Sequence, residues 1–259
     1  MNSTLLTQVI HLSRRSILRL LRQPQVVVPA LLFPLLIFGF QAAGLSTATD
    51  IPGFPADSYL DFLLAFPLVQ GSLFAAVSAG TDLAKDIETG FLNRLSMTPM
   101  NPAALLVGIL AGVVALGLLQ STVFLVFGVI VGANIKAGFL GALVLVALTT
   151  LTALGFGGIG ALLALRTGSG EAVQGLFPLL FVTFFLSSVF LPRDLIENGW
   201  FRTIATYNPV SYLVEGIRSL IIAGWDPQAL ALGFGVAGGV VVVGLSGAVA
   251  SLRGRVART

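Results

Sequence analysis

Long apolar runs, separated by short polar segments, dominate the pattern along this chain. A membrane-crossing helix needs about 20 apolar residues, because the hydrocarbon core is roughly 30 Å thick and its backbone polar groups must bond internally. Six runs reach that length and are apolar all round, whereas barrel strands of about ten residues alternate polar with apolar positions. We predict spans over residues 26–45, 60–82, 103–132, 139–165, 172–192 and 228–252. The predicted fold is all-α, a single polytopic membrane domain over 1–259 with six transmembrane helices.

The residues before the first run carry basic and apolar side chains on opposite helical faces. Arg15, Arg19 and Arg22 lie on the basic face of residues 1–23. This predicts an amphipathic interface helix along the inner leaflet, which Pro24 separates from the first span. A generic basic anchor on anionic lipid would show the same pattern, and the two interpretations are compatible.

A charged stretch, residues 86–99, lies between the second and third runs. Asp86 and Glu88 suit the N-terminus of a helix, and Pro99 marks its end. An apolar side chain recurs at every fourth position, which predicts one apolar face. That face consists of Ile87, Phe91 and Leu95. We expect a short cytoplasmic amphipathic helix here, although spacing alone does not distinguish it from an ordinary interfacial connector.

Residues 193–226 are too polar to cross the bilayer straight. Within them, 210–214 and 217–223 are apolar enough to dip into it. Glu215 and Arg218 lie three positions apart, so we expect a local ion pair that lowers the cost of holding either charge near lipid. We interpret this pair as structural rather than as a substrate contact.

Composition and charge agree with a membrane location. The chain has 56% hydrophobic and only 10% charged residues, with a mean hydropathy of +0.98, whereas a water-soluble surface needs about a quarter charged residues. Lys and Arg concentrate in cytoplasmic segments. With an inner N-terminus, six spans place most of the 14 lysines and arginines on the cytoplasmic side. We therefore predict a multi-pass protein of the bacterial cell membrane with both termini in the cytoplasm.

Several function classes are excluded or disfavoured by what the chain lacks. It has no cysteine and one histidine, which excludes disulfides and both thiolate and multi-histidine metal sites. Its basic residues form no dense patch, so we expect no nucleic-acid partner. No phosphate-binding Gly-x-x-x-x-Gly-Lys-Ser/Thr loop occurs, so an ATPase site and its cofactors are not expected in this chain. A proton-driven carrier and a membrane enzyme are disfavoured, because the apolar runs lack ionisable groups and no cluster has catalytic spacing.

The runs themselves carry uncharged polar groups among many phenylalanines. Such a lining suits a hydrophobic or amphipathic molecule rather than an ion, although serine and threonine in spans more often bond between helices. Three small-x-x-x-small pairs predict close helix approach. These pairs are Gly108 with Gly112, Gly128 with Gly132, and Gly235 with Gly239.

The segment from Glu88 to Pro99, Glu-Thr-Gly-Phe-Leu-Asn-Arg-Leu-Ser-Met-Thr-Pro, resembles the cytoplasmic coupling helix of type-2 ATP-binding cassette exporter permeases. The N-terminal basic helix is similar to the connecting helix of that family. The motifs Leu191-Pro192 and Asn208-Pro209 resemble those around the re-entrant outer helices before the last span. The small size and short first outer loop look most like the drug-resistance branch, of the daunorubicin-exporter permease kind.

This resemblance implies a non-catalytic permease subunit of an ATP-driven exporter for drug-like molecules or lipids. A separate cytoplasmic ATPase subunit would bind ATP and Mg, and a second permease chain, identical or similar, would complete the transporter in the lipid membrane. The alternative is a non-transporting assembly or immunity module that recruits a cytoplasmic partner.

The resemblance also assigns residues to roles. The implied coupling residues are Asp86, Glu88, Gly90, Phe91, Leu92, Arg94, Leu95 and Pro99. In the family, spans two and five line the central path of a dimer, which implies Phe66, Gln70, Phe74, Phe181, Phe184 and Ser188 as substrate contacts. The implied outer re-entrant residues are Asn208, Pro209, Glu215 and Arg218.

Overall fold

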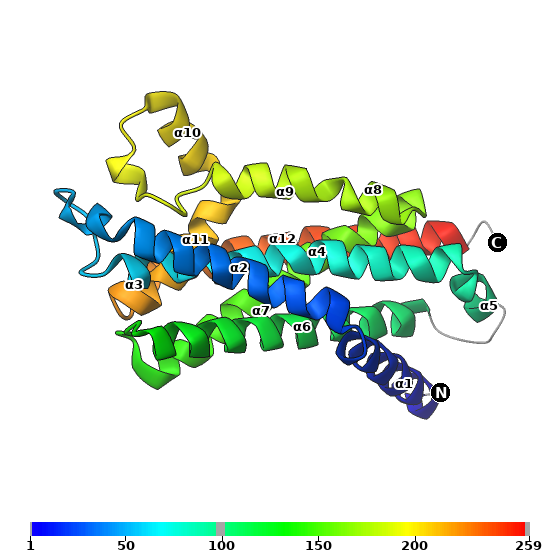
Figure 1. The fold of residues 1–259 in the computed structure, drawn as a ribbon. Coiled ribbons are helices and arrows are strands. Elements are labelled where there is room, and N and C mark those ends of the chain that lie inside the picture. The colour runs from blue at the N-terminus through cyan, green and yellow to red at the C-terminus, as the bar shows by residue number, and fades with distance from the viewer. Residues whose placement is uncertain (1, 97–101, 257–259) are drawn as a thin grey trace.

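The structure is a computed structural model that describes residues 2–96 and 102–256. All regular structure in these ranges is helical (Figure 1), which confirms the predicted all-α class. The long helices are α1 (Asn2–Leu21), α2 (Pro24–Gly44), α4 (Ala65–Glu88), α6 (Pro102–Val131), α7 (Gly138–Thr167) and α12 (Pro227–Val256). The shorter ones are η1 (Ser46–Asp50), α3 (Tyr59–Leu63), α5 (Phe91–Ser96), α8 (Gly170–Gln174), α9 (Leu176–Phe185), η2 (Arg193–Leu195), α10 (Gly199–Tyr207) and α11 (Pro209–Ile222).

Five helical segments in the described ranges are long and apolar enough to cross a membrane. They are α2, the consecutive pair α3 and α4, α6, α7 and α12. Their bounds lie within a few residues of five predicted spans, except that α4 extends six residues beyond 82 to Glu88. The protein is therefore polytopic, as predicted.

The predicted fifth span, 172–192, is not one continuous helix. It is divided into α8 and α9, which together run only from Gly170 to Phe185. Pro178 has no backbone N–H to bond the carbonyl of Gln174, so helical bonding is interrupted near Gly175. Beyond Phe185 the chain bends, and the count of six membrane crossings stays a prediction.

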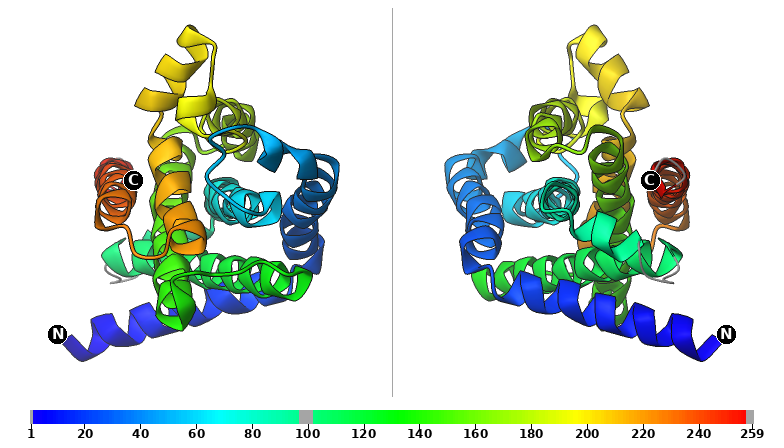
Figure 2. Two further views of the ribbon diagram at one scale, coloured as in Figure 1. Left: turned by 90° about the vertical axis from the view of Figure 1, so that its left-hand side faces the viewer. Right: turned by 90° about the vertical axis from the view of Figure 1, so that its right-hand side faces the viewer.

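Helix α4 occupies the centre of the bundle. Its membrane segment is 83% buried, compared with 11% for α2, and the end-on views show α4 enclosed by other helices (Figure 2). Glycines allow α4 and α7 to approach closely, since a Cβ on Gly160 would lie 1.8 Å from the carbonyl oxygen of Ala76. The sequence that reads as a uniform apolar run is therefore a core helix rather than a lipid-facing one.

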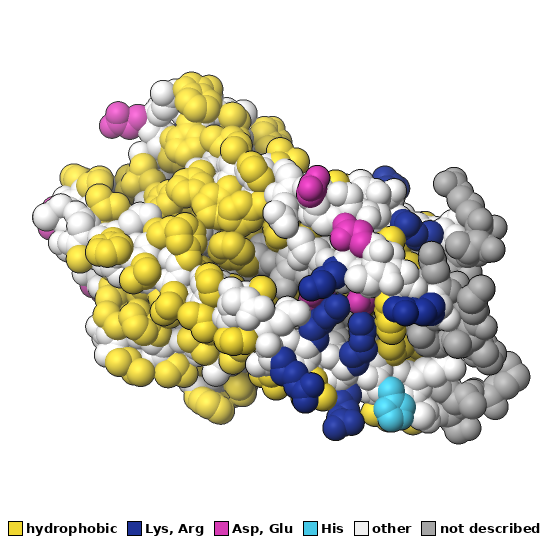
Figure 3. All heavy atoms as spheres, turned by 45° about the vertical axis from the view of Figure 1, so that its right-hand side comes forward, with side chains coloured by type: hydrophobic (Ala, Val, Ile, Leu, Met, Phe, Trp, Pro, Cys, Tyr) yellow, Lys and Arg dark blue, Asp and Glu magenta, His cyan; other side chains and the backbone are white. Residues whose placement is uncertain are grey.

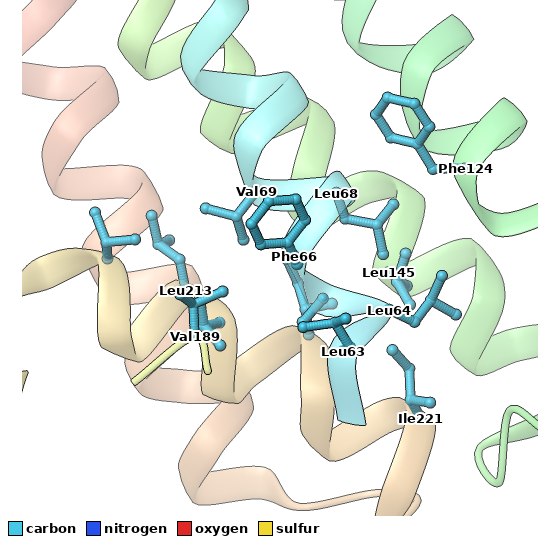
Figure 4. Close-up of a cluster of buried hydrophobic side chains, with 14 of the residues drawn as sticks. Leu63, Leu64, Phe66, Leu68, Val69, Phe124, Leu145, Val189, Leu213 and Ile221 are labelled. Atoms are coloured by element: carbon cyan, nitrogen blue, oxygen red, sulfur yellow. The ribbon is translucent and has the colours of Figure 1, made fainter. Parts of the chain in front are cut away.

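The largest hydrophobic cluster lies at the end of the bundle where α3 and α11 meet α4. Figure 4 shows Leu63, Leu64 and Phe66 among side chains from four other parts of the chain. Those partners include Phe124, Leu145, Val189, Leu213 and Ile221. Burial of these apolar groups fixes the start of α4 against α6, α7 and α11.

Helix α1 lies crosswise to the long helices at the opposite end of the bundle, the end that also holds α5 and the C-terminal end of α12 (Figures 1 and 2). It packs on α6, where Cβ atoms on Gly108 and Gly112 would meet Leu12 and Ser16 within 2.4 Å. The predicted close approach at Gly108 and Gly112 is thus confirmed. A Cβ on Gly235 or Gly239 would meet nothing within 4 Å, so that predicted contact does not occur within the chain.

Candidate coupling site and substrate path

The prediction that Asp86 and Glu88 open a separate helix is wrong. Both belong to the last turn of α4, which continues to Glu88. The helix ends because Gly90 adopts a positive φ of 67°, a conformation that suits glycine at the end of a helix. The short helix α5 then begins at Phe91. The motif is therefore a helix end, a turn and a second short helix.

Asp86 holds α1 against the end of α4. Its side chain is only 4% exposed and accepts two hydrogen bonds from Arg15, each 3.0 Å long. Arg19 donates a third at 2.9 Å and lies 3.8 Å from Asp82. A buried carboxylate with two guanidinium partners is stable, whereas one without them would be costly. Arg22, the third predicted interface arginine, is exposed.

Glu88 links the end of α4 to the start of α8. Its Oε1 accepts a 2.9 Å hydrogen bond from the backbone N–H of Gly170, while the Ser169 hydroxyl accepts one from Ala172. Arg255 of α12 reaches the same region and donates to the carbonyl of Leu165 at 2.8 Å. The ends of α4, α7, α8 and α12 therefore converge beside α5.

The described part of α5 combines one anchored face with one exposed face. The Phe91 ring lies under the Arg15 guanidinium at 4.0 Å, and Leu92 is buried in the second hydrophobic cluster. Arg94 is exposed and donates to the Thr89 carbonyl at 3.5 Å. The side chain of Leu95 and all of Pro99 lie outside the described residues.

The predicted path residues on α4 and α9 face one another as rows of rings. Phe66 lies 5.2 Å from Phe184, and Phe181 lies 6.4 Å from Phe184 between ring centroids. Phe177, which the sequence interpretation left out of the path, connects the rows by lying 5.1 Å from Phe74 and 4.6 Å from Phe181. The sequence prediction thus selected neighbouring side chains.

Gln70 is the polar member of this row. It lies one helical turn from both Phe66 and Phe74 on α4, and the residue is fully buried. Neither its amide nitrogen nor its amide oxygen has a hydrogen-bond partner among the described residues. Buried amides are normally paired, so this amide is an exception within an otherwise apolar row, and its contact with substrate stays a prediction.

At the end of the bundle opposite α5, Arg218 joins three segments of the chain. It is buried and donates to the backbone carbonyls of Phe62, Ser188 and Val189, at 3.1, 3.0 and 2.9 Å. Its guanidinium also stacks on the Phe62 ring at 3.4 Å. The fork geometry of arginine suits this arrangement, because its donors point in several fixed directions.

The predicted ion pair between Glu215 and Arg218 is wrong. Glu215 instead pairs with Arg193 and accepts a 3.0 Å hydrogen bond from the Ser188 hydroxyl. The reason is that backbone carbonyls already occupy the donors of Arg218. Burial alone would lower the pKa of Arg193, but the charge of Glu215 and its hydrogen bond outweigh burial and raise that pKa.

Ser188, the remaining predicted path residue, is bonded to the same cluster, and its place in the path stays a prediction. Its hydroxyl donates to Glu215, and its backbone N–H donates to the Ser211 hydroxyl at 3.0 Å.

Asn208 caps the N-terminus of α11, since its Oδ1 accepts from the N–H of Val210 at 2.9 Å. Pro209 occupies the first helical position, where its missing N–H costs nothing.

Two functional partners were missed from the sequence. Arg193 directly follows the Leu191-Pro192 motif, and this position could have identified it from the sequence. Gly170 offered none, because its partner Glu88 lies 82 positions away and a backbone N–H leaves no trace in a residue pattern.

Comparison with known proteins agrees with this arrangement. The family model described as ABC-2 type transporter matches residues 7–222, which include every predicted site residue. The daunorubicin resistance ABC transporter permease protein DrrB1 of Streptomyces coeruleorubidus is 35% identical over 185 residues, covering 66% of this chain and 61% of that protein.

More distant relatives include the putative transport permease ycf38 of Cyanophora paradoxa, which is 28% identical over 81% of this chain and 72% of its own length. The probable doxorubicin resistance ABC transporter permease protein DrrC of Mycobacterium tuberculosis is 24% identical, over 60% of this chain and 55% of its own length. With helices long enough to cross a membrane and a family match over most of its length, the chain belongs to the ABC-2 type transporter family.

Proposed function

We propose that this chain is the membrane permease subunit of an ATP-driven exporter. A separate cytoplasmic ATPase subunit supplies the energy, with ATP and Mg bound there. The chain works with a second permease chain in the bacterial cell membrane and has both termini in the cytoplasm. Family membership and the drug-resistance relatives support this proposal.

The observation that carries the proposal is the way α5 is connected. Its exposed face presents Arg94 to a partner, while its other face contacts Arg15 and the hydrophobic cluster. The adjoining end of α4 is bonded to α1 through Asp86 and to α8 through Glu88. A force applied to α5 by an ATPase would therefore reach α1, α4 and α8 together.

The transported compound is hydrophobic or amphipathic, because the aromatic row between α4 and α9 offers flat apolar faces. Gln70 supplies one polar group in that row. Pockets with mostly apolar walls and one or two polar groups recognise compounds of this kind. Drug-like molecules and lipids both fit this description.

The test is purification of the tagged chain from its own cells, followed by measurement of ATP hydrolysis in proteoliposomes with and without a lipophilic compound. We expect an ATPase chain to co-purify and its turnover to rise with the compound. Arg94→Ala should abolish this stimulation, since it removes the exposed charge of α5 without touching the core. The matched control is Arg253→Ala, an exposed arginine near the end of α12.

Two outcomes would contradict the proposal. If the compound stimulates ATP hydrolysis equally with Arg94→Ala and with wild-type protein, then α5 is an ordinary connector rather than the coupling contact. A partner that stays bound but shows no compound-dependent turnover would instead favour a non-transporting module that recruits a cytoplasmic protein.

A further inference from the structure

An apolar pocket lies between the corner of α1 and α2 and the inner helices. Its volume is about 590 Å³, within the range of pockets that hold small molecules. Helix α4 contributes Phe74, Val77, Ser78 and Thr81, while the α1–α2 corner contributes Leu20, Val26, Val27, Pro29, Ala30 and Phe33. Leu116, Gln174 and Phe177 complete the wall.

The chemistry of this wall favours hydrocarbon. No charged side chain lines it, and the Thr81 hydroxyl is already bonded to the carbonyl of Val77 at 2.7 Å. Because α1 lies crosswise at the cytoplasmic end, the adjoining pocket lies at the depth of the inner leaflet under the orientation proposed above. Lipid acyl chains are the most abundant apolar groups in this leaflet.

A second hollow, of about 380 Å³, lies on the basic face of α1. It is lined by His11, Arg14, Arg15, Leu18, Arg19 and Arg22. Figure 3 shows Lys and Arg side chains gathered in a band where the broad hydrophobic surface ends. Among the described residues Arg15 and Arg19 are paired with carboxylates, whereas Arg14 and Arg22 are exposed and form no ion pair.

Both hollows are lined by α1 near its C-terminal end, although they share no lining residue. Arg19 lines the basic hollow while its neighbour Leu20 lines the apolar pocket. Arg22 stands just before Pro24, at the corner from which Val26 and Val27 enter the pocket wall. An acidic group on Arg22 and Arg14 would therefore have an apolar space beside it for an attached chain.

We propose that this combined site binds an anionic phospholipid of the inner leaflet. One acyl chain occupies the apolar pocket, and the phosphate contacts Arg22 and Arg14 on α1. Each basic residue near the surface favours an anionic lipid, and the pocket adds chain burial that a plain basic surface lacks. Phe74 and Phe177 of this pocket also belong to the aromatic row of the proposed path, so the lipid site adjoins that path.

The test is native mass spectrometry of the purified chain in detergent with equal amounts of palmitoyl-oleoyl phosphatidylglycerol and phosphatidylcholine. Wild-type protein should retain phosphatidylglycerol preferentially. Arg14→Gln with Arg22→Gln should reduce this retention about tenfold or more, and Arg14→Lys with Arg22→Lys should preserve it. The matched control is Arg253→Gln, a cytoplasmic arginine outside the site.

Val77→Trp tests the pocket separately, because the indole would fill the space for the acyl chain. It should reduce phosphatidylglycerol retention, whereas Val242→Trp, at a side chain on α12 that is 67% exposed, should not.

Equal retention of both lipids by wild-type protein, or full retention by Val77→Trp, would overturn the proposal. A wild-type dimer that becomes a monomer in Val77→Trp would also overturn it, since the pocket would then be a contact between copies. If wild-type protein retains phosphatidylglycerol but shows no compound-stimulated ATP turnover, that result would contradict the transport proposal and leave the lipid proposal standing.

Discussion

Single buried charges hold the two ends of the bundle in different ways. Asp86 is paired with the guanidinium groups of Arg15 and Arg19, so removing it would take away the carboxylate of Arg15 and leave Arg19 with the more distant Asp82. The hydrogen bonds of Arg218 to the described residues go to backbone carbonyls, and its guanidinium stacks on an aromatic ring, so its role depends on shape as much as on charge. A lysine could supply the same charge but not the same directions.

Substitution of Arg218 should therefore separate charge from geometry. We expect Arg218→Met to lower the free energy of unfolding by about 2–4 kcal/mol, because three buried carbonyls lose their donor. Arg218→Lys should recover only part of that loss. Thermal unfolding in detergent measures both.

The control for this prediction is Arg202→Gln. Arg202 pairs with Asp194 at 3.3 Å, but both side chains are more than half exposed, so the change should be about 0–1 kcal/mol. Full recovery in Arg218→Lys would contradict the argument from geometry.

Among the helices, the pattern of long charge-poor apolar runs was enough to locate, within a few residues, the five helical segments that could cross a membrane, apart from the extension of α4 to Glu88. The pattern did not indicate the helix break inside the fifth predicted span, because hydropathy does not register the missing N–H of Pro178. It also failed at Asp86, where an acidic residue suggested a helix start although distant arginines from α1 make it stable inside a helix end. Contacts between residues about 70 positions apart leave no local pattern.

Close packing of α4 on α7 yields a prediction for these two helices. Gly160→Ala should lower the free energy of unfolding by about 3 kcal/mol, the upper end for overpacked cores, because its Cβ would collide with the backbone at Ala76. Thermal unfolding in detergent measures the change.

Gly239→Ala is the matched control, since it adds the same methyl group to α12 where nothing lies within 4 Å. It should be neutral or stabilising by up to about 1 kcal/mol. Equal melting temperatures for the two variants would contradict the close-packing argument.

The molecule as a whole has polar groups at both ends and an apolar middle. The basic band, α5 and the ends of α1 and α12 lie together (Figures 1 and 3), while the polar cluster around Arg193 and Glu215 lies at the other end. Because basic residues concentrate in cytoplasmic segments, this distribution supports the orientation proposed above.

A chain without cysteine allows this orientation to be tested directly. We expect Asp57→Cys, at a side chain that is 97% exposed, to react with a membrane-impermeant maleimide on intact cells. Arg94→Cys should react only after permeabilisation. Labelling of Arg94→Cys on intact cells would reverse the proposed topology.

The glycine contacts of α4 with α7 have a mechanical consequence. Close backbone contact at these glycines opposes sliding of α4 along α7, so we expect the two helices to move together. Helix α9 contacts α4 largely through aromatic rings, and ring contacts can re-form at a different offset. If the path widens and narrows, the hinges belong on either side of α9, near Gly175 and in residues 186–192, where regular helical bonding is already broken.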